Sequence, residues 1–462
     1  MANMSEDEKS RREVAIVGGG LVGALSAVFF AKRGYKVDLY ESRQDPRKLQ
    51  FVSLRSINLA LSVRGISALA AVGCERPMVE SGIPMHARMI HTLKGSKYAI
   101  PYGKKGQYIM SVERRKMNEH LLTVAESHPN VTLHFGHKLK KVDVEKAHMT
   151  YKTSSAGEVV DVDADLLVGC DGAYSAVRKE IMRRPRFDYS QEYIPHGYKE
   201  ICLPPDANGK HIMELNYLHI WPRNTFMMIA LPNQDGTFTC TLFAPFDTFD
   251  EIKTNDDVLN FFNKEFLDFI PLIGEEKLLS DWFTNPVGAM VSVKCKPYHV
   301  ADKVVILGDA AHAMVPFYGQ GMNCGFEDCL VLNEILDKHN DNLGAALEEY
   351  SMVRNPDAEA MCDLAMYNYI EMRSSVNSTL FLVKKYFFSF LHWLMPKTVI
   401  PLYTMVTFSR IPYHTVIKRS KLQDNILHRT LSTLLFAASI AGLWQCSRLL
   451  DVKLLNRTWL PF

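Results

Sequence analysis

A glycine-rich turn near the N-terminus constrains the fold of this chain more than any other feature. Gly18, Gly20 and Gly23 form a GxGxxG motif. The motif follows an apolar segment, 13–17, and opens an Ala- and Leu-rich segment that extends to about Arg33. The first glycine permits a tight turn, the second lets a pyrophosphate approach the backbone, and the third lets helix and strand pack closely. The pattern predicts a dinucleotide-binding βαβ unit, with phosphates at the helix N-terminus.

The second strand of this unit is predicted at 36–40 and ends at an acidic residue. Glu41 is placed to accept hydrogen bonds from ribose hydroxyls, as dinucleotide-binding folds require at this point. The alternative is a glycine-rich packing turn that binds nothing. The motif alone does not distinguish NAD from FAD.

Two later segments have the same strand-to-glycine character. The run 165–172, DLLVGCDG, ends at Asp171-Gly172 and on its own could be a simple strand exit. The run 304–312, VVILGDAAH, leads into Gly308-Asp309, where a carboxylate can bind a ribityl or ribose hydroxyl. The loop 319–323, GQGMN, then opens a helix whose N-terminus can stabilise negative charge on a reduced flavin ring.

Composition excludes several classes of protein. The chain has 462 residues, 47% apolar and 23% charged, which suits two or three structural units with a large core. A net charge of +2 and the lack of a basic stripe with interleaved aromatics argue against nucleic-acid binding. Nine scattered cysteines show no CxxC pair and no metal-type Cys/His spacing, so we expect reduced thiols and no metal site.

The three glycine motifs together resemble the flavoprotein hydroxylases of the para-hydroxybenzoate hydroxylase type. In that family the first motif holds the ADP half of FAD, the Asp-Gly segment lies near FAD and NADPH, and the Gly-Asp segment holds the ribityl chain. No second GxGxxG motif follows. Its absence favours enzymes in which NADPH docks transiently. The resemblance therefore implies FAD as cofactor and NADPH as co-substrate.

The family implies an α/β fold with a Rossmann-like FAD-binding domain, an antiparallel-sheet substrate domain and a C-terminal helical region ending in a membrane anchor. The hairpin pattern around the turn Asp235-Gly236 agrees with such a sheet. The predicted boundaries are 12–75, 105–185 and 297–345 for the discontinuous FAD-binding domain, 76–104 and 186–296 for the substrate domain, 346–425 for the helical region closing the active site, and 426–462 for the anchor and tail.

Six further segments closely resemble the kynurenine 3-monooxygenase family. They are RSINLALS (55–62), ARMIH (87–91), AIPYG (99–103), RFDYSQEYIPHGYKE (186–200), MYNYIEMR (366–373) and IPLYTMVTF (400–408). The resemblance extends from about Val14 to Tyr413, with Leu54 in place of an expected glycine and Cys324 in place of an expected alanine. It implies that NADPH and O2 are used to hydroxylate L-kynurenine to 3-hydroxykynurenine through a flavin C4a-hydroperoxide. A related flavin monooxygenase with another substrate, or a non-enzymatic binding protein with a similar fold, remains an alternative.

The resemblance also implies which residues bind the ligands. Those for the substrate carboxylate are Arg88, Tyr102, Asn368 and Tyr403. A guanidinium grips a carboxylate through two hydrogen bonds and phenols add neutral donors, although each residue alone could equally be a surface charge or a core side chain. Those for the cofactor are Gly18, Gly20, Val22, Gly23, Tyr40, Glu41, Arg43, Ala60, Arg114, Leu139, Asp171, Ala176, Asp309, Gly321, Met322 and Asn323. No catalytic side chain is expected, because the cofactor carries the chemistry, and His312 is assigned no role.

The C-terminal segment is the candidate membrane anchor. Residues Thr430 to Ser447 contain no charge and are flanked by Arg429 and Arg448. As a helix this segment would be roughly 27 Å long, about the thickness of a hydrocarbon core, and the alternative is a buried terminal helix. The family implies the mitochondrial outer membrane with the catalytic body facing the cytosol, although an ER anchor is also open. The sequence does not indicate an oligomeric state.

Overall fold

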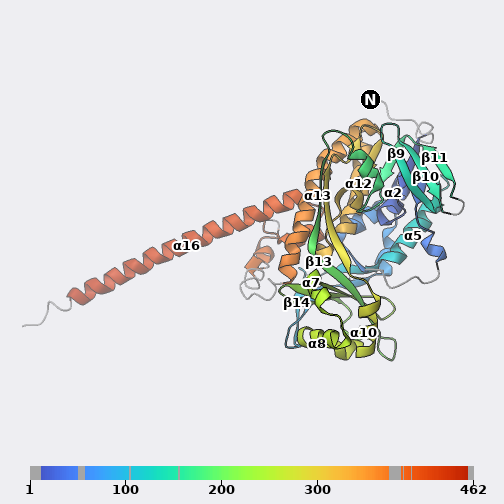
Figure 1. Cartoon of the computed structure of the whole chain (residues 1–462). Coiled ribbons are helices and arrows are strands. Elements are labelled where there is room, and N and C mark those ends of the chain that lie inside the picture. Colours follow the sequence, from blue (N-terminus) through green and yellow to red (C-terminus); the bar gives the residue numbers. More distant parts are fainter. Residues whose placement is uncertain are drawn as a thin grey trace, which may run out of the picture.

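The computed structural model describes residues 12–49, 58–103, 106–154, 157–373, 387–388, 390–396 and 398–455. Two large sheets form the centre of the body, and helix α13 (Leu343–Arg373) contacts both. The long helix α16 (Tyr413–Leu455) leads away from the body (Figure 1). Leu54 lies outside the described residues.

The first sheet is built from strands that are apolar along their length. Strands β1 (Glu13–Val17), β12 (Leu166–Gly169) and β19 (Val304–Ile306) are almost entirely buried. Such strands suit a parallel sheet covered on both faces. The order is β18-β19-β12-β1-β2-β8, with β2 (Lys36–Glu41), β8 (Val131–Phe135) and an antiparallel β18 (His299–Val300). Because β1, β12 and β19 are parallel neighbours, the turns that follow them lie at one edge.

Helices cover this sheet. Helix α2 (Leu21–Lys32) is buried along nearly its whole length because α5 (Arg114–Glu126) and α12 (Gly321–Lys338) pack against it. The remaining short helices around the sheet and its connections are η1 (Pro46–Lys48), α3 (Val63–Ala71), α4 (Glu75–Glu80), α6 (Ala176–Ile181), α11 (Asp309–His312) and η2 (Pro316–Tyr318).

Two small antiparallel sheets flank the first one. One has the order β11-β10-β9 and comprises β9 (His137–Asp143), β10 (His148–Thr153) and β11 (Val159–Asp163). The other has the order β3-β7-β4 and comprises β3 (Asn58–Leu61), β7 (Ile109–Glu113) and β4 (Ile83–Met85). The second small sheet brings Ala60 close to the loop before α12, because Asn323 on α12 hydrogen-bonds its carbonyl.

The second large sheet has seven strands in the order β17-β13-β16-β15-β14-β5-β6. Its strands are β5 (Ala87–His91), β6 (Lys97–Pro101), β13 (Asp188–Leu203), β14 (Tyr217–Arg223), β15 (Phe226–Pro232), β16 (Phe238–Pro245) and β17 (Gly288–Lys296). All pairs are antiparallel except β5 with β14, so a segment early in the chain joins the edge of a later hairpin sheet.

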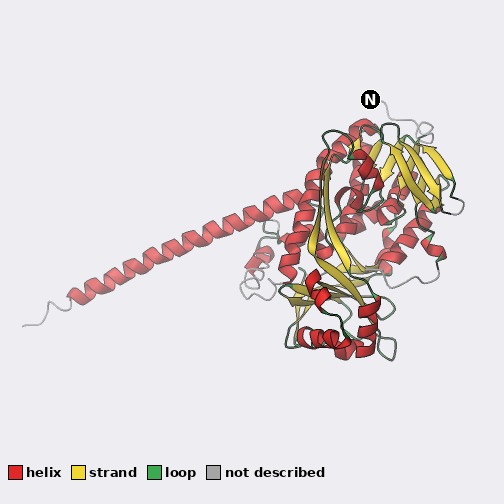
Figure 2. Ribbon diagram, viewed as in Figure 1, coloured by secondary structure: helices red, strands yellow, loops and turns green. Residues whose placement is uncertain are grey.

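Each face of the second sheet packs against a different group of helices. One face buries Trp221 and Phe238 in a core shared with α7 (Phe246–Glu251), α8 (Asn255–Glu265), α9 (Ile270–Ile273) and α10 (Glu275–Thr284). The other face buries Ile220 and Phe243 in a core shared with α13 and η2. Of the first group, α8 and α10 lie at one end of the molecule, below the curved strands (Figure 1 and Figure 2).

The predicted fold class is confirmed at the level of an α/β body with a second, mainly antiparallel sheet and a C-terminal helical region. The anchor is not confirmed. Among the helices that the structure describes, none is both long enough and apolar enough to span a membrane. Several side chains of the predicted anchor, and all of 456–462, lie outside the described residues. The domain boundaries stay a prediction.

Candidate active site

In the turn after β1, only one of the three motif glycines, Gly18, Gly20 and Gly23, has room for a side chain. A Cβ on Gly23 would lie 1.9 Å from the Gly18 carbonyl oxygen, and one on Gly18 would lie 2.5 Å from the Cys170 carbonyl oxygen. A Cβ on Gly20 would meet no atom of the described residues within 4 Å. Gly18 and Gly23 are therefore required by packing, whereas Gly20 borders open space at the N-terminus of α2, which lacks a side-chain cap. This space suits a phosphate, whose charge the helix N–H groups attract.

The end of β2 places a carboxylate beside this turn. Glu41 Oε2 accepts a hydrogen bond from the Gly19 amide at 2.8 Å, and Oε1 accepts one from the Arg43 amide at 2.8 Å. The neighbouring Tyr40 ring is buried, stacked 4.3 Å from Tyr151 and 4.5 Å from His134, ring centroid to centroid. Leu139 is half-buried on β9 and packs against the same core.

Asp171 lies where β12 approaches the glycine turn. Its Oδ2 accepts hydrogen bonds from the amides of Ala176 (2.6 Å) and Val177 (3.2 Å), so it caps α6. Its Oδ1 is buried and has no hydrogen-bond partner in the described part of the chain. Burial raises the pKa of this carboxyl group, against the lowering effect of hydrogen bonds from Ser175 and the α6 amides. A cofactor hydroxyl or amide would satisfy the unpaired oxygen.

The Gly308-Asp309 turn packs directly on the first motif. Gly308 has φ +59°, and a Cβ there would lie 2.9 Å from a methyl carbon of Val22. Asp309, the first residue of α11, is exposed at the open edge. Solvent reaches this side chain from one side only, and the protein packed around it raises the pKa of its carboxyl group, a shift that the positive charge of Arg114, at the start of α5, opposes. The third motif and Arg114 therefore face the same region as the glycine turn.

The start of α12 completes this region, and the side chain of the predicted ligand residue Asn323 bonds to the protein backbone there. The Asn323 side chain is fully buried. Its Oδ1 accepts from the Ser62 amide, and its Nδ2 donates to the carbonyls of Ala60 and Gly319, each at 2.8 Å. Its amide therefore ties β3 to the glycine loop, which leaves Gly321 and Met322 at the N-terminus of α12 to meet a ligand through the backbone.

Three of the four predicted substrate residues meet at the edge of the second sheet. Arg88, on β5, is only 4% exposed. Its guanidinium carbon lies 4.7 Å from the ring centroid of Tyr403 and 5.9 Å from that of Tyr102. The two phenol rings are parallel, with centroids 5.3 Å apart. Strand β5, the residue after β6 and helix α15 (Leu402–Phe408) thus build one cluster.

This cluster holds donors without partners. Arg88 Nε and the Tyr102 hydroxyl are buried and have no hydrogen-bond partner among the residues that the structure describes. Burial alone would lower the pKa of Arg88, but Tyr403, Glu371 and Tyr102 raise it above its ordinary value, so the guanidinium is charged. Burying unpaired donors is costly, and a carboxylate is the ligand that would pair with both. The donor set fits an anionic end of a small molecule.

Two residues near Arg88 were not predicted from sequence. The Glu371 Oε1 atom lies 3.6 Å from Arg88 Nη1, and Tyr318 in η2 stacks on Tyr403 with centroids 5.5 Å apart. Glu371 follows Asn368 by three positions on α13, which places the two on one helix face. That periodicity was the signal that could have identified it.

Asn368 contributes differently from Arg88. Its Nδ2 donates to the Phe317 carbonyl at 2.7 Å and contacts the Met372 sulfur at 3.1 Å. The Phe317 ring stacks on Tyr369 with centroids 3.7 Å apart. Asn368 is buried on α13 and fixes η2 against this helix, so its amide nitrogen is already engaged.

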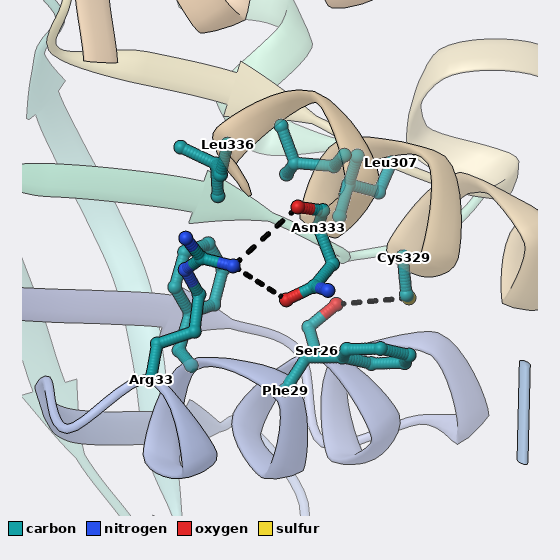
Figure 3. Close-up of a pocket in the computed structure, with 9 residues that line it drawn as sticks. Ser26, Phe29, Arg33, Leu307, Cys329, Asn333 and Leu336 are labelled. Carbon is teal, nitrogen blue, oxygen red and sulfur yellow. Dashed lines mark hydrogen bonds between the residues drawn. The ribbon is translucent and has the colours of Figure 1, made fainter. Parts of the chain in front are cut away.

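Two other features are separate from this site. A small pocket between α2 and α12 is lined by Ser26, Phe29, Arg33, Cys329 and Asn333, with Arg33 hydrogen-bonded to Asn333, and none of the predicted ligand residues lines it (Figure 3). Among the described residues, His312, Cys324 and Asp328 come close enough together to hold a metal ion. However, Asp328 already pairs with His312 at 2.6 Å and with Arg354 at 2.8 Å, so its carboxylate is not free for an ion.

Comparison with known proteins identifies relatives over nearly the whole chain. The family model "FAD binding domain" matches residues 11–365. Kynurenine 3-monooxygenase from Sus scrofa is 54% identical, covering 93% of this chain and 90% of the relative. Those from Anopheles gambiae and Candida albicans are 51% and 43% identical, covering 93% and 95% of this chain and 88% and 98% of theirs.

Solved structures show the same fold at lower identity. 2-Methyl-3-hydroxypyridine-5-carboxylic acid oxygenase superposes with a TM-score of 0.64 at 20% identity, covering 79% of this chain and 94% of that one. p-Nitrophenol 4-monooxygenase from Pseudomonas putida gives 0.62 at 19%, covering 79% and 90%. At this identity the likeness concerns the fold alone.

Proposed function

Because this chain belongs to the FAD-dependent kynurenine 3-monooxygenase family, we propose that it hydroxylates the aromatic ring of L-kynurenine, with NADPH as electron donor and O2 as oxidant. The observation that carries the proposal for the substrate is the cluster of Arg88, Tyr102 and Tyr403, in which Arg88 Nε and the Tyr102 hydroxyl are buried donors without a partner among the described residues. It suits the carboxylate of an amino acid, because guanidinium and phenol donors together satisfy both of its oxygens. Glu371, 3.6 Å from Arg88, is placed to accept from the ammonium group of the same amino acid.

The residues proposed for the cofactor fit FAD. The open space at Gly20 would hold the pyrophosphate, Glu41 the ribose, and Asp309 the ribityl chain. The unpaired Asp171 Oδ1 supplies an acceptor at the same edge. When bound, the flavin would accept electrons from NADPH and activate O2.

The protein's own contribution is orientation and exclusion of water. Arg88 fixes one end of the substrate, which leaves the aromatic end free to extend from the Arg88 cluster. The rings of Tyr102 and Tyr403 lie beside the guanidinium, and the buried Tyr318 ring stacks on Tyr403. Rings that exclude water strengthen the ionic contacts and protect reactive species from hydrolysis. No side chain is required to donate or accept a proton in this proposal.

The test compares matched substrates with the purified, FAD-loaded protein. We expect L-kynurenine to stimulate NADPH oxidation, whereas the same aromatic ketone without the amino-acid end should stimulate it weakly or not at all. Equal stimulation by both compounds would show that the Arg88 cluster does not select the substrate. In that case another aromatic hydroxylation would be the better assignment.

We propose also that the C-terminal segment holds the protein at a membrane, namely the mitochondrial outer membrane with the body facing the cytosol. In support, α16 leads away from the body (Figure 1), and Phe436, Leu443 and Trp444 on it are exposed. A chain ending near residue 425 should lose its membrane association in fractionated cells. Continued sedimentation of that chain with membranes would contradict the proposal.

A further inference from the structure

A buried network of charged side chains lies behind the proposed FAD site and takes no part in the function proposed above. It consists of Glu327 and Asp328 on α12, Arg64 on α3, Arg354 and Asp357 on α13, and His312 on α11. Each of these residues is at most 3% exposed. Buried charges of this kind persist only when each is paired and hydrogen-bonded, so the partners show what the network holds in place.

Asp328 fixes both ends of the single helical turn that carries Asp309. Its Oδ2 accepts from the Gly308 amide at 2.9 Å, just before that turn, and from His312 Nε2 at 2.6 Å, at the end of it. Asp328 lies on α12, the helix whose N-terminus is the proposed flavin-facing loop. One carboxylate therefore sets the position of Asp309 relative to Gly321 and Met322.

Arg354 connects this carboxylate to the helix that carries substrate residues. Its Nε donates to Asp328 Oδ1 at 2.9 Å, and its Nη1 contacts Glu327 at 3.2 Å and Asp357 at 3.0 Å. Nη2 also donates to the Cys324 carbonyl at 3.2 Å, near the start of α12. Arg354 lies on α13, about 21 Å along the helix axis from Asn368 and about 26 Å from Glu371.

Arg64 extends the network to the segment that follows Tyr403. Its Nη1 contacts both oxygens of Glu327, at 2.9 and 2.8 Å. Its Nε and Nη2 donate to the carbonyls of Val406 and Ile411, at 3.0 and 2.5 Å. The network thus meets the turn for the cofactor, the α13 helix with Glu371, and the α15 segment with Tyr403.

Each carboxylate of the network faces at least one positive group. Burial lowers the pKa of His312, but Asp328 and Cys324 outweigh burial and raise that pKa well above its ordinary value, which favours the protonated imidazole. Arg64, Arg354 and His312 thus face the three carboxylates, and at the margin Arg410 lies 3.7 Å from Glu327 and His414 lies 2.9 Å from Asp357. Because these side chains are buried, a shift of one member changes the interactions of the others.

We propose that Asp328 and Arg354 are positioning residues that hold the FAD-binding turn and the substrate-binding helix in one arrangement, so that binding of either ligand favours binding of the other. The inference rests on the proposed function for the identity of the two ligands. Coupling of this kind is reciprocal: kynurenine must tighten FAD binding by the same factor by which FAD tightens kynurenine binding.

The test measures this factor without turnover. Full-length protein in detergent is stripped of FAD and titrated with FAD, in the absence of NADPH, with and without saturating L-kynurenine; flavin fluorescence gives the Kd. We expect kynurenine to lower the Kd for FAD about 10-fold in the wild type, within the usual range of allosteric coupling. Arg354→Lys keeps the charge but loses the fork of donors, and should reduce the factor to about 2-fold, a loss of the size that coupling mutations produce.

Asp341→Asn is the matched control. Asp341 is also buried and pairs with Arg33 at 2.5 Å, but this pair joins α2 to the loop after α12. The control should keep the wild-type coupling factor even if its melting temperature falls. If Arg354→Lys does not fold, His312→Gln serves instead. It removes the positive partner of Asp328 on the cofactor side of the network.

The outcomes are distinct. An unchanged coupling factor in folded Arg354→Lys or His312→Gln, or an equal loss in Asp341→Asn, overturns the inference. Tight binding of both ligands to the wild type without coupling also overturns it, and leaves the proposed function intact. A wild type that binds FAD but no kynurenine refutes the proposed function itself.

Discussion

Replacing Arg88 by Met should separate substrate binding from stability. Methionine fills a similar volume but removes two charge-assisted hydrogen bonds to the substrate carboxylate, each with a net value of about 1.5–3 kcal/mol. We therefore expect kynurenine binding to weaken by roughly 3–6 kcal/mol, which is about a hundredfold to ten-thousandfold in Kd.

Stability should change far less than binding. In the free protein Arg88 is buried, its Nε has no partner among the described residues, and its ionic partner Glu371 is 3.6 Å away with 19% of its side chain exposed. Removing one partner of a buried ion pair is destabilising because the other charge is left uncompensated, but a carboxylate that water still reaches keeps part of its hydration. The melting temperature of Arg88→Met should therefore fall only slightly below that of the wild type, with FAD content unchanged.

The assay is titration of L-kynurenine into the FAD-loaded variant, followed by the flavin absorbance spectrum, with thermal unfolding in parallel. A Kd within about threefold of the wild-type value would refute the assignment of Arg88, since one lost charged hydrogen bond already costs more than that. A large fall in melting temperature together with loss of FAD would instead make Arg88 a structural residue.

Three further predictions concern the cofactor edge, the buried network and the substrate amine. Gly20→Ala should fold normally but bind FAD weakly, because its Cβ meets no atom of the described residues yet enters the proposed phosphate space. Gly23→Ala should instead lose stability, because its Cβ would lie 1.9 Å from the Gly18 carbonyl oxygen. Thermal unfolding of the FAD-free proteins and FAD titration separate the two effects. Protonated His312 stabilises the fold, because its pKa is raised in the folded state. This stabilisation is complete below the pKa of the unfolded state, about 6.5, and is lost as pH rises through the higher pKa of the folded state. Unfolding free energy should thus decline at alkaline pH in the wild type and less steeply in His312→Gln; parallel profiles would contradict this. Glu371→Gln should raise KM for L-kynurenine more than for its analogue that lacks the amino group, and an equal rise for both would exclude an ionic contact with the ammonium.

The sheet and the glycine turns could be predicted because their signals are local. β1 is apolar throughout and is followed at once by Gly18 and Gly23, whose lack of a side chain is required by contacts of 2.5 and 1.9 Å. The place of β5 was harder, because its parallel pairing with β14 joins segments far apart in sequence. It was inferred from the family resemblance, not from periodicity.

Side-chain roles were predictable only in part. The expectation that Asn323 and Asn368 bind ligands stays a prediction, and the structure adds that their amide nitrogens are bonded to backbone carbonyls. Glu371 could have been found from its spacing of three residues from Asn368, whereas Tyr318 was missed because only the packing of η2 brings it to Tyr403. The network around Arg354 joins residues from four helices that are distant in sequence, so no spacing in the sequence predicts it.

The identity of the product tests the central claim most directly. The purified, FAD-loaded protein is incubated with L-kynurenine, NADPH and 18O2, and the product is analysed by mass spectrometry. The account predicts NADPH-dependent formation of 3-hydroxykynurenine that carries one 18O atom. NADPH oxidation without any hydroxylated kynurenine, or a hydroxylated product without the label, would contradict it.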